Sequence, residues 1–123
     1  MDESQFADRI AQIRARFVSK LADRIQETGA ALSQMTGDGS NAVEAVATAY
    51  RRFHDVCGIG ATIGFEATGR VARTLDAVLV GPFRDHRGLS GDELATLAEG
   101  LKALGMAAQT EMQSTDSDRE LVS

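Results

Sequence analysis

The sequence is poor in residues that interrupt or cross-link a chain. It contains one cysteine, one proline and no tryptophan. One cysteine cannot form an intramolecular disulfide, and a single proline leaves long stretches free to be helical. We find no apolar run long enough to cross a membrane and no N-terminal pattern typical of a signal peptide. We therefore expect a cytoplasmic protein that does not contact a membrane.

The chain also lacks a block of positive charge. It has 13 lysines and arginines against 18 aspartates and glutamates, which gives a formal net charge of −5. No basic segment is interleaved with aromatic residues, so we expect no nucleic-acid partner. With 123 residues, the chain is long enough to form one domain with its own hydrophobic core, without metals or disulfides.

Apolar residues recur at helical spacing in four segments. They lie within residues 6–35, 42–61, 65–79 and 94–112, and no window alternates as a strand does. We therefore predict an all-α fold, a monomeric antiparallel up-down four-helix bundle over residues 1–113. An additional short N-terminal helix is expected to separate from the next helix near residues 17–19, and residues 114–123 are expected to form a disordered tail.

Local signals predict where these helices begin and end. Asn41 with Glu44, and Ser90 with Glu93, have the spacing of capping boxes. Gly64 permits a sharp turn, so the helices on either side of it should be antiparallel neighbours. The Gly81-Pro82 pair is expected to stop the third helix, leaving residues 80–89 as a loop.

His54 is the residue with the strongest case for a chemical role. On a wheel of about 100° per residue, it lies at the margin of the apolar stripe, so one edge of its ring should meet water. Gly58, one turn later, has no side chain to obstruct a partner. A neutral histidine is a nucleophile at near-neutral pH when its other ring nitrogen is held as N–H. Counting across the Gly64 turn places Asp76 within a turn of His54, which makes Asp76 the candidate holder.

The segment His54 to Phe65, HDVCGIGATIGF, and the later pair Leu75-Asp76 resemble the histidine-containing phosphotransfer (HPt) domain of two-component phosphorelays. The family pattern is roughly H-x-x-K-G, small residues, G-[FA] and then an L-E-like pair, and the likeness extends over residues 17–80. The resemblance implies the bundle fold, phosphorylation of His54, and exchange of the phosphoryl group with receiver-domain aspartates of response regulators. It further implies that the receiver supplies Mg²⁺, that a hybrid sensor kinase is a further partner, and that this chain needs no cofactor.

Cys57 departs from this pattern, because the family has lysine there. Arg51, one turn before His54, is a candidate replacement, since guanidinium binds phosphate oxygens well. We expect the partner to contact the surface that holds Gly58, Ala61, Cys57, Arg70 and Arg73. For each of these arginines the alternative is an ordinary solvated cation. Gly60 lies on the apolar stripe, where close helix packing explains it better than access does.

Other functions remain open at this stage. The alternative to a relay is a non-catalytic bundle that binds and regulates a receiver or sensor kinase. The chain lacks a glycine-rich phosphate loop, so we expect a histidine phosphocarrier without kinase activity of its own. A metal site is disfavoured, because His54 and Cys57 have only the distant His86 as a strong third ligand and a closed zinc site needs four.

Overall fold

The computed structural model describes residues 3–37 and 39–122, with side chains up to Ser114. This part of the chain is almost entirely helical, and the all-α prediction is confirmed. The elements are α1 (Glu3–Ala31), the short 3₁₀ helix η1 (Leu32–Gln34), α2 (Ser40–His54), α3 (Val56–Thr62), α4 (Glu66–Arg84) and α5 (Gly91–Val122). None of the described helices combines the length and the apolar character needed to cross a membrane.

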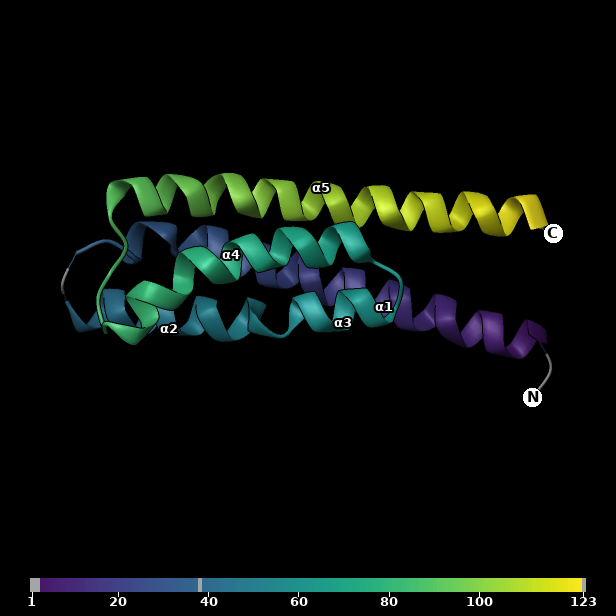
Figure 1. Cartoon of the computed structure of the whole chain (residues 1–123), viewed down its shortest axis with the longest axis horizontal. Coiled ribbons are helices and arrows are strands. Elements are labelled where there is room, and N and C mark those ends of the chain that lie inside the picture. The colour runs from purple at the N-terminus through teal and green to yellow at the C-terminus, as the bar shows by residue number, and fades with distance from the viewer. Residues whose placement is uncertain (1–2, 38, 123) are drawn as a thin grey trace.

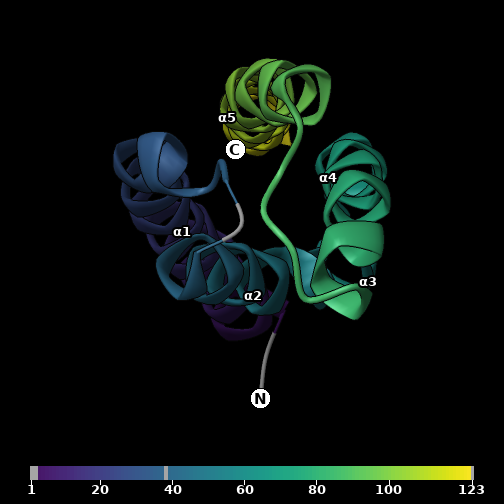
Figure 2. The ribbon, with the colours of Figure 1, turned by 90° about the vertical axis from the view of Figure 1, so that its left-hand side faces the viewer.

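The helices lie side by side along one long axis (Figure 1). The chain reverses direction between α1 and α2, between α3 and α4, and between α4 and α5, whereas α3 follows α2 along the same line. Seen along that axis, α1, α2, α4 and α5 surround a common interior (Figure 2). α4 packs against α2, α3 and α5, and α1 packs chiefly against α5.

One apolar cluster fills this interior. Phe53 is its largest fully buried side chain, and Phe65 at the start of α4 is equally buried. The other fully buried apolar side chains of large or medium size come from all four long helices, from α3 and from the segment after η1, namely Leu21, Met35, Val46, Val56, Leu75, Leu79, Leu97 and Leu104. The first half of α1 contributes less than its periodicity suggested, because Phe6 is 60% and Ile13 43% exposed.

Two helices are longer than the sequence analysis predicted. α1 is a single helix of 29 residues, so the separate short N-terminal helix and the break near residues 17–19 were wrong. α5 continues to Val122, where a disordered tail from residue 114 was expected. Neither region contains a proline or glycine that would stop a helix, and lack of apolar periodicity alone does not end one.

The signals at helix ends had mixed outcomes. Ser90 and Glu93 form the predicted capping box, with the Glu93 N–H donating to Ser90 Oγ at 3.1 Å and the Ser90 N–H donating to Glu93 Oε1 at 2.9 Å. The Asn41 box does not form, because Gly39 is the N-cap of α2 and no side chain caps that helix. Pro82 lies inside α4, which ends only at Arg84, so the predicted stop at Gly81-Pro82 was also wrong.

The tight turn at Gly64 is present as predicted. Gly64 has φ +88°, in the left-handed region that favours glycine. Arg14 of α1 donates from Nε to the Ile63 carbonyl at 2.9 Å, and Phe17 packs edge-on against Phe65 with ring centroids 5.7 Å apart. The turn that brings α4 back beside α3 is therefore held from α1.

Candidate functional site

His54 is the last residue of α2, and its side chain is 61% exposed. Its Nδ1 lies 2.9 Å from Oδ1 of Asp76, which projects from α4 and is 26% exposed. An ionised carboxylate only accepts hydrogen bonds, so Nδ1 is the donor and carries the proton. In the neutral ring, Nε2 therefore retains a free lone pair on an exposed imidazole.

An aromatic pair that the sequence analysis missed flanks the histidine. The ring of Tyr50 lies 4.9 Å from the His54 ring at an interplanar angle of 31°, and Tyr50 in turn stacks on Phe83 of α4 at 4.3 Å and 15°. Tyr50 is one helical turn before His54, and this spacing could have identified it. Phe83 had no such signal, because only the packing of α4 on α2 brings it there.

The helix that carries His54 breaks directly after it. The predicted helix continued to about Ala61, but α2 ends at His54 and α3 begins at Val56. Arg24 of α1 donates from Nη1 to the Arg52 carbonyl at 3.0 Å, and the Cys57 thiol donates to the His54 carbonyl at 3.6 Å. These donors take up carbonyls that a continuous helix would pair with its own N–H groups.

A shallow hollow of about 640 Å³ opens beside His54. Gly58 lies in it, is exposed, and has no atom within 4 Å of where a Cβ would stand. The hollow is lined by His54, Asp55, Cys57, Gly58, Ile59, Thr62 and Ile63. A second protein surface could therefore approach the ring from this side. Ala61, also predicted to contact a partner, is exposed but does not line the hollow.

Gly60 has the opposite environment from Gly58. It is buried, and a Cβ there would lie 3.0 Å from the Phe65 carbonyl oxygen and 3.4 Å from the Gly69 nitrogen. A Cβ on Gly69 would in turn lie 2.9 Å from the Cys57 carbonyl oxygen. The two glycines let the backbones of α3 and α4 approach closely, in keeping with the packing role expected for Gly60.

The phosphate-binding role of Arg51 and the partner-binding role of Arg70 and Arg73 stay predictions. Arg51, Arg70 and Arg73 are all exposed, and no hydrogen bond or ion pair joins any of them to another residue whose side chain is described. Arg52 instead pairs with Glu27 at 3.1 Å. Cys57, where the HPt pattern has lysine, is half-buried and packs against the core.

Metal ligands do not gather at this site. Within the described part of the chain, no three histidine, cysteine, aspartate or glutamate residues are close enough together to hold a metal ion. His86 lies in the connection between α4 and α5 with φ 51° and is exposed.

No known family model, curated protein or solved structure matches this chain.

Proposed function

We propose that this protein is a phosphorelay intermediate of the HPt type, an up-down four-helix bundle that carries a phosphoryl group on Nε2 of His54. It accepts that group from the aspartyl phosphate of a response-regulator receiver domain and returns it to the aspartate of another. The observation that carries the proposal is the 2.9 Å contact between Nδ1 of His54 and Asp76 on an otherwise exposed ring.

The chemistry follows from this contact. The Nε2 lone pair attacks phosphorus, the bond from phosphorus to the aspartyl oxygen breaks, and the receiver aspartate leaves as a carboxylate. Because Nδ1 keeps its proton, the imidazole ring gains a positive charge as the new bond forms. The Asp76 carboxylate stabilises this charge, and reverse transfer follows the same path.

The surroundings of the ring support transfer between proteins. The open position at Gly58 and the hollow beside it leave room for a receiver surface. The resemblance to HPt domains implies that the receiver brings Mg²⁺, and this ion would neutralise charge on the phosphoryl oxygens. We further propose that the protein is a cytoplasmic monomer and that a hybrid sensor kinase is among its partners.

Label transfer tests this function directly. Purified protein is incubated with labelled, phosphorylated receivers from the same genome, beside a His54→Gln variant whose helical content is checked by circular dichroism. We expect acid-labile label on the wild-type protein and none on the variant. Label that persists in His54→Gln, or no transfer from any receiver, would contradict the proposal.

One observation favours a second candidate function. Cys57 stands where the family has lysine, and no hydrogen bond or ion pair joins Arg51 to another residue whose side chain is described. A bundle that binds a receiver or a sensor kinase and regulates it without phosphate needs no such cation. Tight receiver binding without label transfer in the same experiment would support this alternative.

A further inference from the structure

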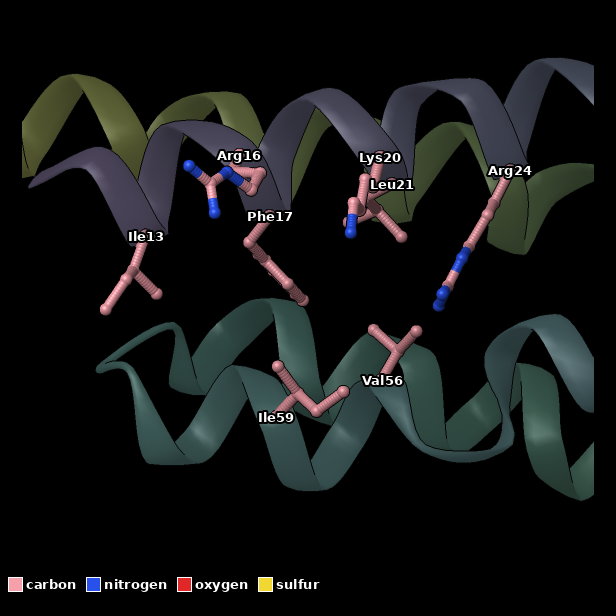
Figure 3. A pocket seen from close by; sticks show the side chains of 8 residues that line it. All are labelled: Ile13, Arg16, Phe17, Lys20, Leu21, Arg24, Val56 and Ile59. Carbon is pink, nitrogen blue, oxygen red and sulfur yellow. The ribbon is translucent and has the colours of Figure 1, made fainter. Parts of the chain in front are cut away.

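A groove of about 250 Å³ separates the middle of α1 from α3. Figure 3 shows Ile13 and Phe17 projecting from α1, and Val56 and Ile59 projecting toward them from the opposite side. Ile13 is 43% and Ile59 41% exposed, two of the few large apolar side chains left open to solvent. The floor of the groove is therefore apolar and accessible.

The α1 side of the groove is lined with positive charge. Arg16, Lys20 and Arg24 recur every fourth residue, which places them on one face of the helix. Arg24 binds the Arg52 carbonyl and lies 3.7 Å from Asp55. No hydrogen bond or ion pair joins Arg16 or Lys20 to another residue whose side chain is described. In a chain with a net charge of −5, this is a local surplus of positive charge.

The groove is continuous with the surface around His54. Ile59 lines both the groove and the hollow beside the histidine. A protein that covers the hollow therefore reaches the groove without a gap. This continuity links the groove to whatever partner docks at the histidine.

The dimensions of the groove suit a protein better than a small molecule. Small-molecule sites usually enclose about 300–1,000 Å³ and bury most of their ligand, whereas this groove of about 250 Å³ is smaller and leaves Ile13 43% and Ile59 41% exposed. An apolar centre with a polar rim that includes arginine is typical of protein interfaces. Charge complementarity then requires carboxylates on the partner.

We propose that the α1–α3 groove is a specificity site for the relay partner. It receives an exposed apolar side chain of the receiver domain, and Arg16 and Lys20 pair with aspartates or glutamates that flank that side chain. This inference rests on the proposed relay function, since the partner is the receiver that exchanges phosphate with His54. The groove thus selects receivers with an acidic docking surface.

Charge reversal in matched pairs tests the groove. Arg16→Glu combined with Lys20→Glu is compared with Arg84→Glu combined with Lys102→Glu, two exposed cations at the end of α4 and on α5. Binding of each receiver is measured by calorimetric titration at low and moderate salt, and label transfer is measured separately. We expect the groove pair to weaken binding about tenfold and to reduce its salt dependence, with the control pair close to wild type.

A second pair of variants tests whether the apolar floor of the groove contributes to receiver binding. Ile59→Ser is set against Met106→Ser, since Met106 is an exposed methionine of α5 at 69% exposure. Only Ile59→Ser should weaken receiver binding, and thermal melts verify that all variants fold.

The outcomes separate the groove from the relay. If the wild-type protein accepts the phosphoryl group but the groove pair and the control pair lose receiver affinity equally, the specificity role of the groove would be wrong and the relay function would stand. Binding that is weakened only by the groove variants, without any transfer, would support the groove and contradict the relay. Absence of receiver binding by the wild-type protein would overturn both.

Discussion

Nδ1 of His54 and Oδ1 of Asp76 are 2.9 Å apart, although the two residues lie 22 positions apart on different helices. The contact keeps the proton on Nδ1 and, in the proposed relay, places a negative charge beside a ring that would become positive on phosphorylation of Nε2. We therefore propose Asp76 as a positioning residue for His54, which sets its tautomer and would stabilise the phosphorylated ring.

Removing this carboxylate should therefore slow transfer without unfolding the protein. We expect Asp76→Ala to lower the rate of phosphoryl transfer about tenfold, by analogy with metal-bound histidines, for which loss of the carboxylate that holds the ring costs about 10–100-fold. Asp76→Asn should have an intermediate effect, because its amide oxygen still accepts the hydrogen bond but lacks the charge. Nitrogen NMR of His54 above neutral pH should show a single tautomer in wild type and a mixture in Asp76→Ala. Unchanged rates and tautomers, equal to those of the exposed control Glu99→Ala, would contradict this role.

Gly58 and Gly60 should respond oppositely to the same substitution. Gly58→Ala meets no atom within 4 Å and should raise the free energy of unfolding by about 0.5–1 kcal/mol, because alanine favours helix more than glycine does. Gly60→Ala brings a methyl group against the Phe65 carbonyl and should lower it by about 1–3 kcal/mol. Urea denaturation measures both changes. Equal effects at the two positions would show that α3 does not pack on α4 as described.

A bulky residue at position 58 addresses access to the histidine. Gly58→Leu should retain the melting temperature of Gly58→Ala to within a few degrees and slow transfer from receivers. Labelling by phosphoramidate, a small donor that needs no docking, should be affected far less. Equal slowing with both donors would mean that the leucine perturbs His54 itself.

The cysteine that replaces the family's lysine offers a test of charge at the phosphorylated ring. Cys57→Lys should lengthen the lifetime of the phosphohistidine. The activation free energy for loss of the phosphoryl group should rise by an amount on the order of 1 kcal/mol or less, as for a partly exposed charge pair. Because Cys57 packs against the core, the same change should lower the melting temperature. If Arg51 is the substitute cation, Arg51→Ala should shorten the lifetime more in the wild-type background than beside Cys57→Lys. Equal losses in the two backgrounds would exclude Arg51 from that role.

Acid should remove one specific stabilising contact at the start of α5. Hydrogen bonds from Arg87, at 2.8 and 3.1 Å, and from the Ser90 N–H lower the pKa of Glu93 from 4.5 to about 2. A lowered pKa in the folded state means that the contribution is present above about pH 4.5 and is lost as the pH falls toward 2.

We therefore expect Glu93→Gln to be less stable than wild type at neutral pH, by an amount on the order of 1 kcal/mol because the pair is partly exposed. The difference should shrink as the pH falls through that window. Thermal melts over a pH series measure it, with Glu99→Gln as the exposed control. A difference that stays constant from neutral to acid pH would show that the Arg87–Glu93 pair does not stabilise the folded state.

Sequence reasoning succeeded where the deciding interactions are local. The spacing of apolar residues identified the helical segments, and the wheel placed His54 at an exposed margin. The Ser90 capping box and the Gly64 turn were also predictable, because each depends on a few neighbouring residues. Asp76 could be assigned to His54 because a short turn joins their helices and limits which positions face each other.

The amino-acid sequence by itself determined that this chain is helical, that its helices have apolar faces to bury, and that His54 lies at the edge of one of them. Tertiary structure alone decided the break after His54, the stacking of Tyr50 on Phe83 and the groove between α1 and α3. Each of these depends on a residue from a distant helix, such as Arg24 at the Arg52 carbonyl. Helical periodicity reports which side of a segment is apolar, whereas the packing of several helices at once decides which side chains from distant segments meet.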